Sequence, residues 1–241
     1  VKGFVVLRPY GYAIWENIQK NLDARFKATG HENVAMPVLI PESLLKKEGE
    51  LVNGFAPEVA WVTAGGSDPL EERLAVRPTS ETMFCDHFSH VLHSYRDLPM
   101  RLGETSTLFR NEDSGEMHGL IRVRQFTISE GHLVLRPDQL EEEFKQCLDL
   151  AKYCLGTVGL LDKCTFRFSQ WDPANPNNKN EGTKEQWDEA QRVMGQILDD
   201  LDVKYEIGID EAAFYGPKLD IQYKNVFGKE DTLVTIQIDM L

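Results

Sequence analysis

Three arginines surround one short polar segment of an otherwise acidic chain. Arg110 precedes residues 111–119, and Arg122 and Arg124 follow them. Alternation of apolar and polar residues over 120–126 predicts a β-strand, which would place Arg122 and Arg124 on one face. Guanidinium groups form bidentate, charge-assisted hydrogen bonds with phosphate oxygens. The cluster therefore indicates either a charged hairpin face or a pocket for a polyanion, and other residues must decide between them.

Two further pairs of polar side chains are candidates for a binding site. Glu130 and His132 alternate along a predicted strand and so share one face. Tyr215 and Lys218 belong to the turn "FYGPK", whose alternative interpretation is a purely structural entry into a hairpin. Neither common glycine-rich phosphate-binding pattern is present. Any phosphate groups would therefore be held by side chains, with Lys218 and the arginines as candidates.

The sequence does not indicate a metal site or a disulfide framework. His87, His90 and His93 spread over about 120° of a predicted helix, and no cysteine or carboxylate repeats their spacing, so a polar helix face is favoured. The chain has four cysteines and no CxxC pair, which favours reduced thiols in the core. They are Cys85, Cys147, Cys154 and Cys164.

Composition bounds the class of protein. A chain of 241 residues with 41% hydrophobic and 27% charged residues fits one large domain, or one domain with a small appendage. It contains no apolar stretch of membrane-spanning length and no secretory signal, so we expect a cytoplasmic protein without a membrane anchor. The net charge of -13 argues against broad non-specific binding to nucleic acid but permits a local basic patch.

Periodicity and turn residues predict the elements that position these side chains. Helices are predicted at 10–29, 41–52, 80–95, 137–159 and 183–201. Strands are predicted at the start of 72–81, at 107–109, 120–126, 131–136, 164–170 and 203–209, and a hairpin is predicted over 218–240. The sum is an α+β fold, with a central antiparallel sheet flanked by helices.

Three other segments are predicted to lie outside helices and central strands. Residues 33–41 are extended, and Pro37 places them at a sheet edge or an interface. Residues 64–72 and 172–182 are predicted to be loops. The arginine–proline pair at Arg77 predicts a surface turn.

Taken together, these stretches resemble the class II aminoacyl-tRNA synthetases. The segment "FRNEDSGEMHGLIRVRQFT" is similar to motif 2 of that class and, in detail, to the threonyl family, as are "EAAFYGPKLDIQ" and "VTIQIDM". This resemblance begins at about residue 94. Residues 1–83, with "GFVVLRPYGYAIWENIQ" and "LAVRPTSET", are instead similar to the archaeal and eukaryotic type of prolyl family, as is "EGH". Both families belong to subclass IIa, so the chain resembles a mosaic within one subclass.

The resemblance implies a role for each residue of the arginine cluster. Arg110 would hold the α-phosphate of ATP and the carboxylate of the amino acid. Glu112 would accept a hydrogen bond from the adenine amino group, and Phe126 would stack on the base. Arg122 would bind the γ-phosphate. Arginines together with Mg²⁺ would offset the repulsion between the attacking carboxylate and the phosphate.

The amino acid side of the implied site combines features of both families. Thr79 and Glu81 match the element by which the prolyl family receives the amino group of its substrate. The threonyl family binds zinc through one cysteine and two histidines; here Glu81 occupies the cysteine position and His132 matches one histidine. The resemblance therefore does not favour zinc. Further residues on the amino acid and ribose side are Glu130, Tyr215, Lys218 and Gln237, with Lys218 also among the catalytic candidates.

The resemblance also implies binding partners and the part of a synthetase that the chain represents. The 3′ end of a tRNA would lie over residues 114–118, and a second copy would pack against the segment around Pro37, which corresponds to motif 1. We expect residues 1–241 to be a single catalytic core that ends before motif 3 and carries no anticodon-binding or editing domain. The expected activity is attachment of threonine to its tRNA, with proline as the alternative amino acid. A third possibility is a non-catalytic paralogue that keeps the fold.

Overall fold

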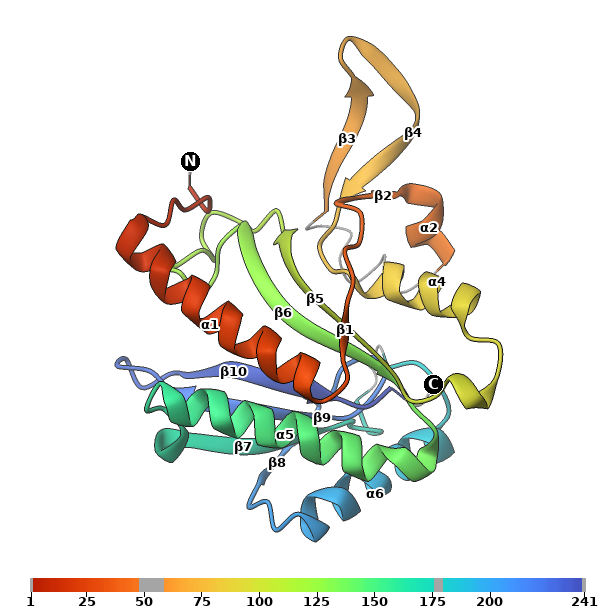
Figure 1. Cartoon of the computed structure of the whole chain (residues 1–241), viewed down its shortest axis with the longest axis vertical. Coiled ribbons are helices and arrows are strands. Elements are labelled where there is room, and N and C mark those ends of the chain that lie inside the picture. Colours follow the sequence, from red (N-terminus) through yellow and green to blue (C-terminus); the bar gives the residue numbers. More distant parts are fainter. Residues whose placement is uncertain (1, 48–58, 176–179, 240–241) are drawn as a thin grey trace. The chain divides into compact units, whose positions relative to one another are not determined.

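The computed structural model describes residues 2–47, 59–175 and 180–239 (Figure 1). The chain divides into two compact units, Val1–Arg136 and Pro137–Leu241. Both combine helices with mainly antiparallel sheets, which confirms the predicted α+β class. The expectation of a single catalytic domain stays a prediction. Among the described helices, none has the length and apolarity needed to cross a membrane.

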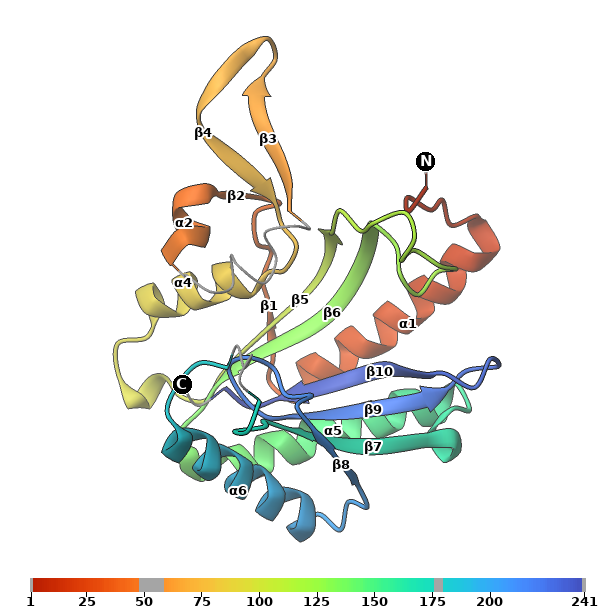
Figure 2. The ribbon, with the colours of Figure 1, turned by 180° about the vertical axis from the view of Figure 1, so that it is seen from behind.

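The main sheet of the first unit carries the arginine cluster. Its strand order is β1, β5, β6, with β1 parallel to β5 and β5 antiparallel to β6. The strands are β1 (Glu32–Asn33), β5 (Met100–Phe109) and β6 (Gln125–Val134). The long β5–β6 pair is visible from both sides in Figures 1 and 2. Its register runs unbroken from Met100↔Val134 to Phe109↔Gln125, so the two strands form a rigid support for the loop that joins them.

A second sheet in this unit corrects one prediction. Its strands are β2 (Leu39–Pro41), β4 (Asp68–Val76) and β3 (Ala60–Gly65), in that order and all antiparallel. Residues 64–72 were predicted to be a loop, but most of them lie in the β3–β4 hairpin. Its turn needs only two residues and a positive φ at Gly66, so the glycines there mark a tight turn rather than a long loop.

Three α-helices and one 3₁₀ helix complete the described part of the first unit. They are α1 (Pro9–Ala28), α2 (Glu42–Lys47), α4 (Glu81–Val91) and η2 (Tyr95–Asp97). α1 confirms the predicted helix, but none of its residues is buried, and Ile14 is 66% exposed. α4 begins as predicted and ends earlier, at Val91. The predicted continuation of α2 over 48–52 lies outside the described residues.

The second unit contains a four-stranded sheet in the order β10, β9, β7, β8. Only the β7–β8 pairing is parallel. Its elements are η3 (Pro137–Gln139), α5 (Leu140–Thr157), η4 (Leu161–Lys163), β7 (Cys164–Gln170), α6 (Lys184–Asp200), β8 (Glu206–Ile209), β9 (Lys218–Lys224) and β10 (Glu230–Gln237). The predicted long helix, the strand after it, the next helix and the final hairpin are confirmed.

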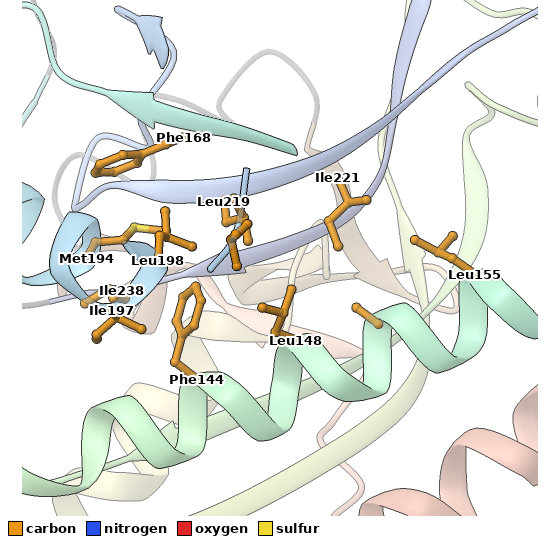
Figure 3. Packing of buried hydrophobic residues seen from close by; sticks show 12 residues of the cluster. Phe144, Leu148, Leu155, Phe168, Met194, Ile197, Leu198, Leu219, Ile221 and Ile238 are labelled. Carbon is orange, nitrogen blue, oxygen red and sulfur yellow. The ribbon is translucent and has the colours of Figure 1, made fainter. Parts of the chain in front are cut away.

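The core of the second unit fixes the strands that carry its candidate residues. Apolar side chains at helical spacing on α5 and on α6 pack against the inward side chains of β7 and β9 (Figure 3). The residues are Phe144, Leu148, Leu155, Phe168, Met194, Ile197, Leu198, Leu219 and Ile221. α6 begins at a capping box, in which the Thr183 hydroxyl accepts from Gln186 N–H and the Gln186 side chain accepts from Thr183 N–H.

None of the four cysteines forms a disulfide, as predicted, but they are not all in the core. Cys85 is exposed on α4, while the other three are half-buried. Burial raises the pKa of Cys147 to about 11, so that thiol stays protonated at neutral pH.

Candidate active site

The loop between β5 and β6 differs from the predicted hairpin. β6 begins only at Gln125, so Arg122 and Arg124 lie in the loop and not on a strand face. His118 and Arg122 exchange backbone hydrogen bonds of 3.2 Å in an isolated bridge, and Gly119 between them has a φ of 54°. Residues 120–124 are therefore part of a tight turn and not of a strand, despite their alternating pattern. The arginines are not brought together by lying on one face of a strand.

Both loop arginines instead converge on Glu112. Glu112 is 6% exposed, and its Oε2 accepts a hydrogen bond from Arg122 Nε at 2.9 Å and lies 2.8 Å from Arg122 Nη2. The backbone oxygen of Glu112 accepts from Arg124 Nε at 3.0 Å. Arg122 Nη2 also lies 2.9 Å from Glu116 Oε2, and the Arg122 side chain is 42% exposed. Arg122 is therefore oriented by a buried carboxylate while remaining accessible to an anion from solvent.

Arg110 and Phe126 are adjacent at the ends of β5 and β6. Arg110 Nε donates to Pro78 O at 3.2 Å, and its guanidinium carbon lies 5.3 Å from the centre of the Phe126 ring. The backbone N–H of Arg110 donates to Arg124 O at 2.9 Å. The structure thus gathers the four predicted ATP-binding residues of the first unit around one loop. A cation next to an aromatic face suits a ligand with a phosphate and a planar base.

A polar cluster forms further along β6, between that strand and the residues at the start of α4. Its members are Thr79, Ser80, Glu81, Glu130 and His132. The backbone N–H of Glu81 donates to Thr79 Oγ1 at 3.2 Å, and the His132 ring stacks on Phe84 with 4.0 Å between ring centres. Glu130 Oε1 and His132 Nδ1 are buried and have no hydrogen-bond partner within the described residues. Buried polar atoms normally have partners, so these two atoms suit contact with a polar ligand.

The two titratable groups on β6 have shifted pKa values in opposite senses. Burial raises the pKa of Glu130 to about 7, and the nearby carboxylates of Glu104 and Glu81 add to the rise. Burial lowers the pKa of His132 to about 4. At neutral pH His132 is therefore uncharged, while Glu130 exists in both protonation states and would become fully ionised beside a bound cation such as an ammonium group.

We expect Glu130→Gln to stabilise the protein at neutral and alkaline pH but not at acid pH. The folded-state pKa of about 7 exceeds the ordinary value of 4.5, so the stability contributed by protonated Glu130 is complete below pH 4.5 and is lost as the pH rises through 7. The variant should therefore gain about 2 to 3 kcal/mol in free energy of unfolding at about pH 8 and little at about pH 4, measured by urea denaturation.

Glu71→Gln, at an exposed position of β4, is the control and should change the free energy of unfolding equally little at both pH values. An equal effect of Glu130→Gln at the two pH values would contradict the raised pKa. Titration of His132 acts at lower pH and is common to both variants, so it does not alter the comparison.

A buried ion pair adjacent to this cluster was missed from the sequence. Arg77 was predicted to lie in a surface turn, but it is 4% exposed, and its Nη1 lies 3.1 Å from Oε1 of Glu104, which is 6% exposed. Arg77 Nε donates to Thr107 O at 3.1 Å, and Ser80 Oγ donates to Glu104 Oε2 at 2.8 Å. Glu104 thus holds Arg77 and Ser80 on either side of Thr79. A guanidinium can be buried where carboxylate and carbonyl oxygens accept hydrogen bonds from its N–H groups. The acceptors of Arg77 are distant in the sequence, so the arginine–proline pair alone could not indicate its burial.

The remaining candidates lie in the second unit. Lys218 Nζ is 2.7 Å from Oδ2 of Asp220, a partner that sequence reasoning did not identify. Asp220 is 2% exposed and also accepts hydrogen bonds from Ser169 and Thr235. The Tyr215 hydroxyl donates to Gln237 Oε1, so these two predicted residues are together. Their predicted place in one site with Arg110 stays a prediction.

The turn that carries Tyr215 requires a glycine. A Cβ atom at Gly216 would lie only 2.0 Å from the backbone oxygen of Ile238, and Ile238 N–H donates to Pro217 O at 3.2 Å. The turn therefore packs directly on the backbone that follows β10. This contact keeps Tyr215 next to Gln237.

Comparison with known proteins assigns the fold and the loop to a family. Residues 61–240 match the model of the tRNA synthetase class II core domain (G, H, P, S and T). The chain belongs to this family. The synthetase core is 44% identical over 238 residues to the threonine–tRNA ligase of Clostridium perfringens, a match that covers 99% of the chain and 36% of that relative. It thus spans about a third of the length of the curated relatives it matches.

The core is also similar to proline–tRNA ligases. It is 52% identical over 164 residues to the enzyme of Clostridium novyi, covering 66% of the chain and 34% of the relative. The match to the enzyme of Ruminiclostridium cellulolyticum is 59% over 132 residues, covering 55% and 27%. Both matches are longer than the 83-residue segment in which we noted the prolyl resemblance, so this likeness extends beyond that segment.

Two solved structures share the fold. A structure described as the RNA binding domain of threonyl-tRNA synthetase from Cryptosporidium parvum superposes with a TM-score of 0.85 at 28% identity, covering the whole chain and 57% of that structure. Prolyl-tRNA synthetase of Giardia lamblia, solved with prolyl-adenylate, superposes with a TM-score of 0.62 at 37% identity, covering 65% of the chain and 32% of that structure.

The described residues do not match the zinc ligand set of the threonyl family. No three histidine, cysteine, aspartate or glutamate side chains converge on a common point within them. His132 instead stacks on Phe84, and its Nδ1 is buried.

Proposed function

We propose that this synthetase core binds ATP and activates threonine as the aminoacyl-adenylate, for transfer to the 3′ end of a tRNA. The observation that carries the proposal is the grouping of Arg110, Glu112, Arg122 and Phe126 around one loop. The grouping provides cations for phosphate, an aromatic face for a base and a buried carboxylate that accepts hydrogen bonds. The similarity of 99% of the chain to about a third of a threonine–tRNA ligase supports the same function.

In the proposed reaction a carboxylate oxygen of the amino acid attacks the α-phosphorus of ATP, and pyrophosphate leaves. Arg110 would hold the α-phosphate and the attacking carboxylate, which reduces the repulsion between two anions without a proton transfer. Mg²⁺ would be bound mainly by the triphosphate oxygens, as is usual for this ion. The chemistry therefore rests on positioned positive charge and not on a general base.

Arg122 would change partners when ATP binds. The γ-phosphate would replace Glu116, whose side chain is 54% exposed and therefore holds Arg122 only weakly. The contact with buried Glu112 would stay and keep the guanidinium in place. Arg122 contacts Oε2 of Glu112, and the other carboxylate oxygen, Oε1, would accept the hydrogen bond from the adenine amino group.

The amino group of the substrate would lie near the β6 cluster. Glu130, Glu81 and Thr79 offer oxygen atoms there, and His132 at neutral pH adds no charge that would repel an ammonium group. Lys218, Tyr215 and Gln237 are the proposed contributions of the second unit to the amino acid and ribose side. Proline is the alternative substrate, supported by the similarity to proline–tRNA ligases.

The partners are part of the proposal. The 3′ end of the tRNA would approach over residues 114–118 of the loop, and a second copy would pack on the segment around Pro37, in the cytoplasm. Pro37 lies between β1 and β2 and takes part in neither strand. α1, which precedes this segment, has exposed apolar side chains that include Ile14 and Ile18.

ATP–pyrophosphate exchange by the complete protein, with threonine, proline and serine assayed in parallel, tests the proposal. We expect exchange with threonine and much less with the other two. Exchange with proline alone would assign the alternative substrate. ATP binding without exchange for any of the three amino acids would indicate a non-catalytic paralogue, and absence of ATP binding would overturn the proposal altogether.

A further inference from the structure

We infer that Arg124 is a positioning residue for the proposed ATP site and that Gly3, which precedes α1, holds Arg124 in place. The inference rests on the proposed function, in which Arg124 itself has no contact with the substrate. Arg124 joins three parts of the chain. Its N–H donates to Gly3 O at 2.9 Å, its carbonyl accepts from Arg110 N–H at 2.9 Å, and its Nε donates to Glu112 O at 3.0 Å.

These contacts make the positions of Arg110 and Glu112 depend on one residue. Arg110 is held through its backbone, and Glu112 through its backbone oxygen, while the Glu112 carboxylate orients Arg122. A shift of Arg124 would therefore move both proposed phosphate-binding arginines. Because its guanidinium is used internally and is half-buried, Arg124 is suited to holding the loop rather than to binding phosphate.

Gly3 lies against the loop in a geometry that only glycine fits. Its carbonyl accepts from Gln125 N–H at 3.1 Å as well as from Arg124 N–H. It has a φ of 82°, and a Cβ atom there would lie 2.6 Å from Met117 Sδ and 2.9 Å from Arg124 Cγ.

A second contact comes from the neighbouring residue. Lys2 Nζ donates to Ser114 O at 2.6 Å, on the opposite arm of the loop. The segment before α1 therefore contacts the loop on both of its arms. This arrangement can limit how far the arms move apart.

The role of Arg124 is tested by Arg124→Met in ATP–pyrophosphate exchange with the complete protein. We expect the KM for ATP to rise about tenfold or more, and the KM for the amino acid to rise by a smaller factor, because only one of the two displaced arginines, Arg110, is proposed to hold the amino acid as well. Arg124→Lys retains an N–H donor for Glu112 O and should recover part of the loss. Arg96→Met, at an exposed arginine of η2, is the matched control and should leave both constants unchanged. An unchanged KM for ATP in Arg124→Met would overturn the inference.

The role of Gly3 is tested by Gly3→Ala with amide hydrogen exchange as the direct readout. The N–H groups of Arg124 and Gln125 should lose protection, and the KM for ATP should rise as it does in Arg124→Met. Gly11→Ala is the matched control, because a Cβ added at Gly11 of α1 would meet no atom within 4 Å apart from its chain neighbours and the backbone of its own helix.

Two outcomes would contradict the role of Gly3, and a third concerns the proposed function. Unchanged protection of both N–H groups would show that Gly3 does not hold Arg124. Lost protection with an unchanged KM for ATP would show a contact without a positioning role. If the unaltered protein shows no exchange with any amino acid, the proposed function fails, and the amide exchange still decides whether Gly3 holds the loop.

Discussion

Arg110→Ala is expected to lower kcat/KM for ATP in pyrophosphate exchange by about 100- to 1,000-fold, the usual cost of removing one preorganised donor from a developing negative charge. Arg110 is the proposed cation at the α-phosphate, where bond formation and bond breaking both occur. Its side chain is only half-buried, and Nε donates to the backbone oxygen of Pro78. The loss should therefore appear in activity and ATP binding, with little change in the thermal unfolding midpoint.

Two control variants make this result specific. Arg110→Lys keeps the charge but not the bidentate geometry, so we expect it to recover only a small part of the activity. Arg192→Ala removes an exposed arginine of α6 that pairs with Glu189, and it should leave exchange unchanged. Exchange by Arg110→Ala within about threefold of the unaltered protein would contradict the role of Arg110 at the α-phosphate.

Arg77→Met is expected to have the largest effect on stability. It would leave the Glu104 carboxylate buried without its cation, and breaking such a pair typically costs about 3 to 5 kcal/mol. The substitution also removes the hydrogen bonds that the Arg77 guanidinium donates to Thr107 O and Met36 O. These two bonds connect β5 with the segment around Pro37. The free energy of unfolding, measured by urea denaturation, should fall accordingly.

The control for this prediction is another arginine–glutamate ion pair, which lies on the surface. Arg73 contacts both carboxylate oxygens of Glu42 at 2.7 Å, but its side chain is 48% exposed. Arg73→Met should therefore destabilise the protein far less than Arg77→Met. The double variant Arg77→Met with Glu104→Gln should recover part of the lost stability, since no buried charge is then left unpaired. Equal effects at Arg73 and Arg77 would contradict the assigned difference in burial.

The same ion pair connects stability with the proposed site. Glu104 pairs with Glu130 in the β5–β6 register, and Ser80, which donates to Glu104, precedes Glu81. Negative charge on Glu104 also contributes to the raised pKa of Glu130. Variants at Arg77 should therefore be examined for pH dependence as well as for stability, because loss of the Arg77 charge would raise the pKa of Glu130 further.

The sequence by itself determined the elements whose signals are local. Helical spacing predicted α1, α5 and α6, with Gly30 after the first and Pro137 before the second as boundary residues, and alternation predicted β7 and the β9–β10 hairpin. The motif residues Arg110, Glu112, Arg122 and Phe126 were also identified from the sequence, through the resemblance to motif 2. Residue types alone indicated only the arginines and Lys218 as candidates for binding phosphate. The β6 pair Glu130 and His132 was placed on one face correctly, since strand geometry alone requires it.

Only the tertiary structure decided which of these residues contact one another. Arg77 and Glu104 are 27 positions apart, and Ser169 and Asp220 are 51 positions apart, so neither pair has a local signal. Alternation over 120–124 predicted a strand, but the loop uses those residues to carry Arg122 and Arg124 to Glu112. Burial, pairing of charges and the point at which a strand ends depend on segments distant in the chain, and local propensity does not contain that information.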